Sequence, residues 1–200
     1  MKRLAVLISN AGTGTNLQAI IDGINSKKIN AEIVVVISDR EDSYGLKRAK
    51  ENSIPTEVNS DKENLLPLLQ RYNVDYVCLA GWKQFLTDEF IDIFENRILN
   101  LHPGLLPDTL GGIAKNPDGT DGLWNKQMFT TKAIQNFLDT GATYAGSSVH
   151  FITHEVDFGK VLGRCFEKIE DGDTTETLYK RLKVKENKLY VEVLERLCNE

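Results

Sequence analysis

The sequence predicts an α/β fold with a doubly wound, mostly parallel sheet that has helices on both faces. Short apolar segments alternate with segments whose apolar residues recur at helical spacing, which is the pattern of strands joined by crossover helices. The strand segments are apolar throughout rather than at alternate positions, as expected when helices cover both faces of a sheet. The 200 residues, 41% of them hydrophobic, fit a single domain, 1–200, that needs no disulfide or metal for stability.

The first half of the chain follows this alternation closely. The predicted strands are 4–9, 31–37, 54–58 and 75–80, and the predicted helices between them are 16–24, 44–52 and 65–72. Ligands of such sheets bind beyond the carboxyl ends of the strands. The loops that follow strands, at 9–16, 81–86 and 100–107, are therefore expected to line one crevice.

The second half begins with a strand at 98–101 and ends with two strands, 144–153 and 159–169, and a long helix capped by Thr174 or Thr175. Between them, segment 108–141 is rich in turn-forming residues and is interpreted as an insertion, with a helix at 126–138. Residues 111–122 contain four glycines and little apolar content. This composition predicts a mobile lid with Trp124 as its apolar anchor. The alternative is a surface insertion in which Trp124 only packs against the protein surface.

The composition excludes several classes of protein. The 24 Lys and Arg residues are outnumbered by 29 Asp and Glu residues and form no long basic run, so a nucleic-acid partner is not expected. The cysteines Cys78, Cys165 and Cys198 lack CxxC spacing, which argues against both a disulfide framework and a zinc site. The first apolar segment is too short for a signal peptide and no segment could span a membrane, so the sequence predicts a cytoplasmic protein.

Asn100 and His102 lie two residues apart at the end of a predicted strand, immediately before Pro103. Alternate residues of a strand share a face, so both side chains would point into the same crevice. An imidazole transfers protons near neutral pH and a carboxamide donates a hydrogen bond to a developing oxyanion, which suits acyl transfer. A polar strand end that caps a turn explains these two residues equally well.

Asp157 lies at the predicted turn between the last two strands. Its carboxylate can pair with His102, favour the protonated ring and fix its orientation, although an aspartate close to a glycine is also a common turn residue. His150, on a strand among apolar neighbours, is at least as readily a core histidine as a catalytic one. His154 is expected to face solvent.

The loop 9–16 reads Ser-Asn-Ala-Gly-Thr-Gly-Thr-Asn and connects a strand to a helix. Its backbone N–H groups and the positive end of the helix dipole can hold a phosphate. The loop lacks the third glycine of a dinucleotide motif and the Lys-Ser/Thr pair of a Walker A loop. We therefore interpret it as a phosphomonoester site, with a plain capped turn as the alternative.

Together these segments resemble the phosphoribosylglycinamide formyltransferases of the folate-dependent formyltransferase family. The resemblance runs through nearly the whole chain, including 7–9, 14–20, 79–81, 99–107, 148–151, Asp157 and Glu186. The Asn-x-His-Pro motif with the aspartate is shared by folate formyltransferases of this fold in general. The glycine loop and Lys185-Glu186-Asn187 are similar to those of the enzymes that act on glycinamide ribonucleotide.

The resemblance implies direct transfer of a formyl group from 10-formyltetrahydrofolate, the co-substrate, to the amine of 5-phosphoribosylglycinamide in de novo purine biosynthesis. It implies catalytic roles for Asn100, His102 and Asp157, and substrate binding by Gly14, Thr15, Asn16 and Glu186. The implied folate pocket consists of Lys62, Lys83, Gln84, Phe85, Leu86, Asn100, Thr153, His154, Glu155, Val156 and Asp157. No metal, nucleic acid or membrane is implied, and a monomer or homodimer is expected.

Some features depart from the family pattern. The 108–141 insertion replaces a shorter segment, the glycine loop is two residues longer, Leu101 replaces the usual Ile, and Lys62 stands where an Arg that contacts folate is expected. Two alternatives remain. One is a related formyltransferase or formyl hydrolase acting on another amine or on water, and the other is a non-catalytic nucleotide-binding module of the same fold.

Overall fold

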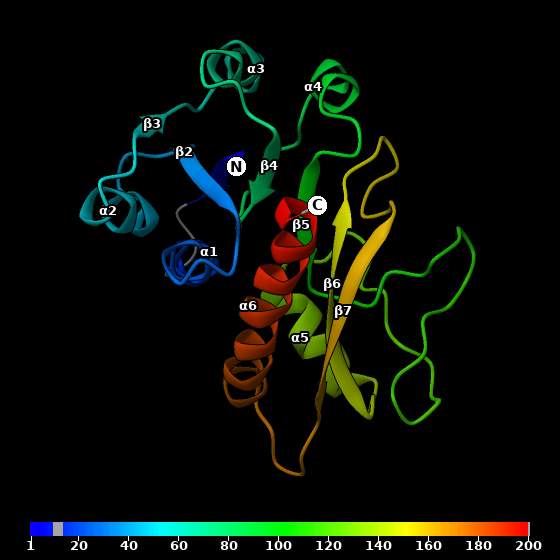
Figure 1. Ribbon diagram of the computed structural model, residues 1–200. Coiled ribbons are helices and arrows are strands. Elements are labelled where there is room, and N and C mark those ends of the chain that lie inside the picture. Colours follow the sequence, from blue (N-terminus) through cyan, green and yellow to red (C-terminus); the bar gives the residue numbers. More distant parts are fainter. Residues whose placement is uncertain (10–13, 200) are drawn as a thin grey trace. The chain divides into compact units, whose positions relative to one another are not determined.

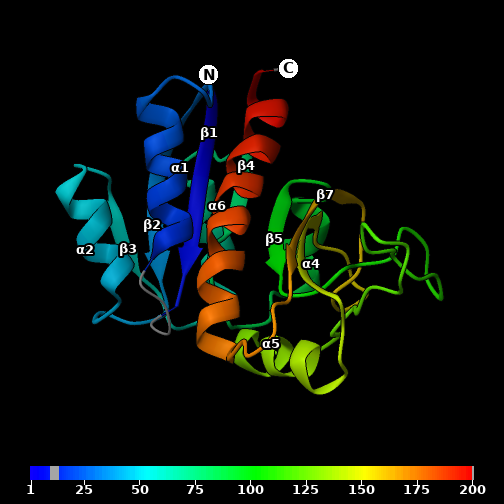
Figure 2. The same cartoon turned by 90° about the horizontal axis from the view of Figure 1, so that it is seen from below.

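The computed structural model describes residues 1–9 and 14–199, which contain seven strands and six helices (Figures 1 and 2). The strands form a mixed sheet in the order β3-β2-β1-β4-β5-β6-β7. Every pairing from β3 to β5 is parallel, and β6 and β7 are antiparallel. The α/β fold with a mostly parallel sheet that the sequence predicts is therefore confirmed.

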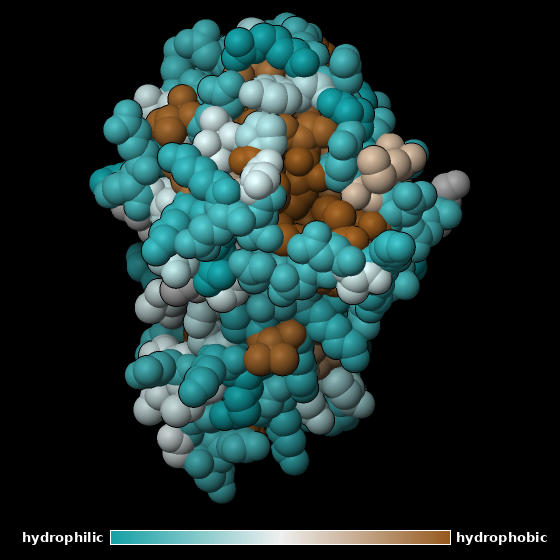
Figure 3. All heavy atoms as spheres, turned by 60° about the vertical axis from the view of Figure 1, so that its left-hand side comes forward, coloured by the Kyte–Doolittle hydropathy of each residue, from teal (hydrophilic) through white to brown (hydrophobic). Residues whose placement is uncertain are grey.

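The face of the molecule drawn in Figure 3 is mainly hydrophilic, with apolar side chains gathered in a smaller area. Among the described residues, no helix is both long enough and apolar enough to cross a membrane. The same residues contain no cluster of three His, Cys, Asp or Glu side chains that could hold a metal ion.

One compact unit consists of Met1–Asn100 and Tyr190–Glu200. Helices α1 and α3 lie on opposite faces of its parallel strands (Figures 1 and 2). The side chains from Leu4 to Leu7 on β1 are fully buried, as expected for a strand covered on both sides. The elements of this unit are β1 (Lys2–Ile8), α1 (Thr15–Asn25), β2 (Ala31–Ser38), α2 (Tyr44–Glu51), β3 (Thr56–Val58), α3 (Lys62–Gln70), β4 (Tyr76–Leu79), α4 (Asp88–Ile93) and most of β5 (Ile98–His102).

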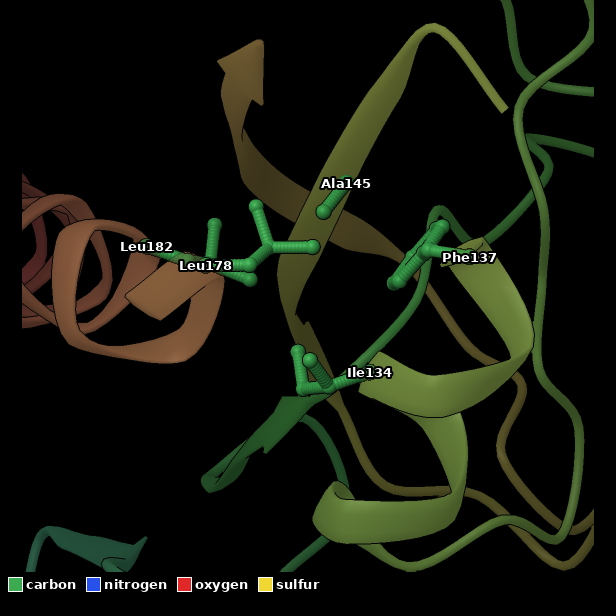
Figure 4. Close-up of a cluster of buried hydrophobic side chains, with 5 residues drawn as sticks. All are labelled: Ile134, Phe137, Ala145, Leu178 and Leu182. Carbon is green, nitrogen blue, oxygen red and sulfur yellow. The ribbon is translucent and has the colours of Figure 1, made fainter. Parts of the chain in front are cut away.

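The second compact unit is Leu101–Leu189. It contains α5 (Thr130–Asp139), β6 (Tyr144–Phe151), β7 (Val161–Lys168) and most of α6 (Thr175–Asn199). Helices α5 and α6 both send apolar side chains toward β6, where they bury a shared cluster (Figure 4) of Ile134, Phe137, Ala145, Leu178 and Leu182. This cluster fixes the hairpin of β6 and β7. The sequence-based division into a single domain, 1–200, stays a prediction.

The predicted strand boundaries agree with the observed ones to within two residues, but the helices differ in three places. Helix α3 begins three residues before the predicted position because the Asp61 carboxylate accepts a hydrogen bond from the Glu63 N–H. Helix α4 was not predicted, although Thr87 caps it in the same way. Helix α5 begins at Thr130 rather than at 126, because Asn125 and Gln127 have left-handed backbone conformations that no helix contains.

The segment 111–122 of the insertion is folded onto itself. The Gly122 N–H donates to the Ala114 carbonyl at 2.8 Å, and the Asn116 N–H donates to the Thr120 carbonyl at 2.9 Å. Ala114 and Asn116 are both buried. These contacts give the segment a local fold of its own, and its mobility stays a prediction.

Candidate active site

His102 is the last residue of β5, and Pro103 follows it as the sequence predicts. Its side chain is only 2% exposed, and its Nδ1 lies 3.5 Å from Oδ1 of Asp157. The structure thus brings together the imidazole and the carboxylate that the sequence analysis paired. Asn100 lies two residues before His102 on the same strand, and alternate residues of a strand share a face. The strand on which the predicted role of Asn100 depends is therefore present.

Asp157 lies in the turn between β6 and β7, with a left-handed backbone (φ 50°). Its Oδ2 accepts a hydrogen bond of 2.7 Å from the backbone N–H of Gln127. Burial raises the pKa of this carboxyl, but the hydrogen bond and charge of His102 and the Gln127 N–H outweigh it, so the pKa lies below its usual value. Asp157 is therefore an ionised acceptor at neutral pH.

The second ring nitrogen of His102 also has a hydrogen-bond partner. Its Nε2 lies 2.7 Å from the backbone carbonyl oxygen of Trp124, in the insertion. A carbonyl oxygen can only accept, so Nε2 must carry the hydrogen. The Trp124 indole in turn donates from Nε1 to the backbone oxygen of Asp157 at 2.9 Å.

Asn125 anchors the segment that carries these contacts. Its buried side chain donates from Nδ2 to the carbonyl of Pro103 at 3.1 Å and to that of Ala133 at 3.4 Å. Its Oδ1 accepts from Nδ2 of Asn136, on α5, at 2.8 Å. Sequence reasoning missed this role. The available signal was weak, since asparagine tolerates a left-handed backbone better than most residues do.

His150 is fully buried on β6, and its Nδ1 lies 2.9 Å from the Phe151 carbonyl. Its ring is nearly perpendicular to that of His102, with centroids 6.4 Å apart. Burial, with a smaller contribution from the charge of His102, lowers the pKa of His150 to about 4. It is therefore neutral at physiological pH, which agrees with the core-histidine interpretation. His154 is exposed, as predicted.

The residues that precede Asp157 form an exposed turn beside the pair. Thr153 Oγ1 donates to the Phe158 carbonyl at 2.8 Å, and Lys126 Nζ lies 2.5 Å from Glu155 Oε1. Thr153, His154, Glu155 and Val156 are all exposed. Their predicted contact with folate is not tested by these contacts and stays a prediction.

In the first unit, two of the three predicted crevice loops meet. The Lys83 N–H donates to Ser9 Oγ at 3.1 Å, and Ser9 Oγ donates to Asp39 Oδ2 at 2.8 Å. Lys83, Gln84, Phe85 and Leu86 belong to the loop between β4 and α4, where the Phe85 ring is exposed. Lys62 is the first residue of α3, and its Nζ lies 4.0 Å from Glu63 Oε1.

Gly14 has a left-handed backbone (φ 68°) immediately before α1 and offers no capping side chain to its first turn. Thr15 is the first residue of that helix and Asn16 is buried. Residues 10–13 of the predicted phosphate loop lie outside the described residues. The phosphate site stays a prediction.

Glu186, on α6, is buried in a polar cluster of the second unit. Its Oε1 accepts from Ser147 Oγ at 2.6 Å, and its Oε2 lies 3.1 Å from Lys183 Nζ. The sequence analysis assigned Glu186 to substrate binding, which stays a prediction, and did not identify either partner.

The arrangement around His102 favours one kind of chemistry. Its nitrogens face a carboxylate and a carbonyl oxygen. A carboxylate-paired imidazole can accept or release a proton and stabilise a developing charge. It does not have the geometry of an imidazole that activates a serine or cysteine nucleophile, because neither nitrogen is directed at a hydroxyl or thiol.

Comparison with known proteins identifies the family of the chain. A family model described as formyl transferase matches residues 2–194. The phosphoribosylglycinamide formyltransferase of Haemophilus influenzae is 35% identical, over 95% of this chain and 84% of its own. Some relatives are longer: the chain is 33% identical to the chloroplastic enzyme of Arabidopsis thaliana but spans 66% of it, and it spans 18% of a trifunctional purine biosynthetic protein of Bos taurus.

Solved structures give the same result. Glycinamide ribonucleotide transformylase 1 of Symbiobacterium toebii has a TM-score of 0.84 and 35% identity, with 100% of this chain and 88% of that chain covered. The phosphoribosylglycinamide formyltransferase of Brucella melitensis has a TM-score of 0.82 and 31% identity, covering 100% and 96%. With the family model extending over nearly all of its residues, the chain belongs to the formyl transferase family.

Proposed function

We propose that the protein transfers a formyl group from 10-formyltetrahydrofolate to the amine of 5-phosphoribosylglycinamide, a step of purine biosynthesis. The observation that carries the proposal is the pairing of the buried His102 with Asp157, the two residues that the resemblance implies to be catalytic together with Asn100. The similarity to phosphoribosylglycinamide formyltransferases over nearly the whole chain supports the same substrates.

In the proposed reaction, the substrate amine attacks the formyl carbon and forms a tetrahedral intermediate. The bond from that carbon to N10 of the folate then breaks, while the attacking nitrogen loses one proton and N10 gains one. Asn100 donates a hydrogen bond to the oxyanion, and His102 with Asp157 handles the proton. The products are the formamide and tetrahydrofolate.

The binding roles in the proposal follow the sequence analysis. Gly14, Thr15 and Asn16 hold the phosphate at the start of α1, and Glu186 binds the glycinamide or ribosyl part. The folate contacts are Lys62, the loop from Lys83 to Leu86, and the turn from Thr153 to Asp157. The exposure of residues 153–156 of that turn, beside the His102–Asp157 pair, supports its assignment to the folate pocket.

An assay of the purified protein tests the proposal. We expect formylation of 5-phosphoribosylglycinamide and a matching release of tetrahydrofolate when both substrates are present. Controls are a reaction without the amine, which detects hydrolysis, and one with an amino sugar nucleotide as acceptor. Hydrolysis at the same rate with and without the amine, or formylation of the amino sugar alone, would overturn the proposal in favour of a related enzyme.

We also propose that the enzyme acts in the cytoplasm as a monomer or homodimer, as the sequence predicts. The hydrophilic face drawn in Figure 3 supports a protein that works in water. Sedimentation velocity of the purified protein distinguishes the two assembly states, and fractionation of cells tests the location.

A further inference from the structure

We infer that Trp124 is a positioning residue for the proposed reaction, which fixes the ring of His102 in one tautomer and holds Asp157 against it. The inference rests on the proposed function for the roles of His102 and Asp157. Its structural basis lies within the second unit, where one segment of the insertion, 124–127, contacts both members of the pair.

The first contact determines the tautomer. Because the Trp124 carbonyl can only accept, the bond of 2.7 Å keeps the hydrogen of His102 on Nε2. Nδ1 is then the nitrogen that gains or loses a proton, and it is the one that faces Asp157. The protonated ring donates to both acceptors, whereas the neutral ring keeps only the bond to Trp124.

The second contact holds the carboxylate in place. The Trp124 Nε1–H donates to the backbone oxygen of Asp157 at 2.9 Å, and the Gln127 N–H donates to its Oδ2 at 2.7 Å. Asp157 has the left-handed backbone that few non-glycine residues adopt. The two bonds support this conformation and keep the carboxylate aligned with Nδ1.

Trp124 is itself held on several sides. Its ring lies 6.0 Å from that of Phe158, and Lys126 Nζ lies 5.0 Å from the ring centroid. Asn125, the next residue, donates hydrogen bonds from its side chain to the carbonyls of Pro103 and Ala133. Gly104 leaves room for the Trp124 carbonyl, because a Cβ at position 104 would collide with that oxygen. The contact with His102 therefore depends on a glycine within the His-Pro-Gly motif.

The tautomer can be measured without any activity. The chain has three histidines, so long-range 15N–1H NMR spectra of the labelled protein can be assigned with His150→Asn and His154→Gln variants. We expect neutral His102 to carry its hydrogen on Nε2. Gly104→Ala should displace the Trp124 carbonyl, because the added Cβ collides with it, and give a mixture of tautomers. Gly104 does not have a left-handed backbone, so the alanine adds no backbone strain of its own.

Kinetics of Trp124→Phe test the second contact, because phenylalanine keeps an aromatic ring but removes the Nε1–H donor. We expect kcat to fall about tenfold and both KM values to stay within about twofold, with an altered pH profile of kcat. Leu110→Ala is the matched control, since Leu110 belongs to the same 108–141 insertion but lies outside the predicted lid and is 60% exposed. It should leave kcat and its pH profile unchanged.

The inference would be overturned by an Nδ1–H tautomer in the unmodified protein, or by unchanged kcat and pH profile in Trp124→Phe. A higher kcat in that variant would overturn it as well, because Trp124 would then restrain His102 rather than align it. Absence of formyl transfer by the unmodified protein would instead contradict the proposed function. The NMR measurement on the unmodified protein decides the tautomer in either case, because it does not depend on activity.

Discussion

Asp157 and Glu186 are carboxylates of the second unit whose partners differ in kind. Asp157 lies in a turn, faces the imidazole of His102 and is partly accessible. Glu186 lies within helix α6, is buried, and faces the ammonium group of Lys183 and the hydroxyl of Ser147. A histidine changes charge near neutral pH, whereas a lysine with a high pKa does not.

The difference indicates what each site can contribute. Burial lowers the pKa of Lys183, but the charge of Glu186, together with Tyr179, raises it above its ordinary value. That cluster therefore keeps its cation over the physiological range and provides a constant charge. An imidazole–carboxylate pair is instead suited to proton transfer, so the comparison favours the acid–base role proposed for His102 and Asp157 over one for Glu186.

The largest expected effect is on turnover at the His102–Asp157 pair. His102→Ala and Asp157→Asn should each lower kcat at least about a hundredfold, because proton transfer and charge support typically contribute on that order. Steady-state kinetics measure this, and circular dichroism checks that the fold is kept. Rates close to those of the unmodified protein in either variant would remove the proposed catalytic roles.

The next effect is on stability at the Glu186 cluster. Lys183→Met should lower the free energy of unfolding by about 2–3 kcal/mol, because it leaves a buried carboxylate without its cation. Urea denaturation measures the change. Lys180→Met, an exposed position on the same helix, is the matched control and should change the free energy of unfolding by less than about 0.5 kcal/mol. Equal losses in both variants would mean that Lys183 acts only through helix packing.

His150 extends the comparison to a fully buried imidazole on β6. Its pKa is about 4 in the folded protein and about 6.5 when unfolded, so protonation favours the unfolded state. The destabilisation caused by His150 is absent above about pH 6.5, and the free energy of unfolding decreases as the pH falls toward 4. By linkage the loss at pH 5 is about 2 kcal/mol.

His150→Asn tests this effect, since an amide can still donate to the Phe151 carbonyl. Urea midpoints at pH 7.5 and pH 5 should fall less between the two conditions for this variant than for the unmodified protein. An identical fall in both proteins would show that other groups cause the acid sensitivity.

The smallest expected effect concerns the glycine loop, where the proposed ligand group is a phosphate and would carry the negative charge itself. Gly14→Ala should raise the KM for 5-phosphoribosylglycinamide about fivefold and leave that for the folate within about twofold. A Cβ there would lie 3.2 Å from Gly45 Cα, and the left-handed backbone costs about 1 kcal/mol for alanine. Equal changes in both KM values would indicate a structural loop rather than a phosphate site.

The sequence was sufficient for much of the fold because hydrophobic periodicity, caps and prolines are local signals. It predicted the strands of the sheet, the end of β5 at Pro103, and either Thr174 or Thr175 as the cap of α6. Thr174 is the cap, since its Oγ1 accepts from the Thr177 N–H. It failed at α5, where the helical pattern at 126–129 is overridden by left-handed residues that tertiary contacts stabilise. It also missed α4, a short helix whose cap was not recognised.

For the candidate site, the sequence by itself predicted that the side chains of His102 and Asp157 form an imidazole–carboxylate pair, since one lies at a predicted strand end and the other at a predicted turn. Only the tertiary structure decided which ring nitrogen of His102 faces the carboxylate. That choice depends on the Trp124 carbonyl, and every residue has a carbonyl, so no side-chain pattern identifies it. It depends equally on the path of the insertion, which is set by long-range contacts of Asn125 that local periodicity does not encode.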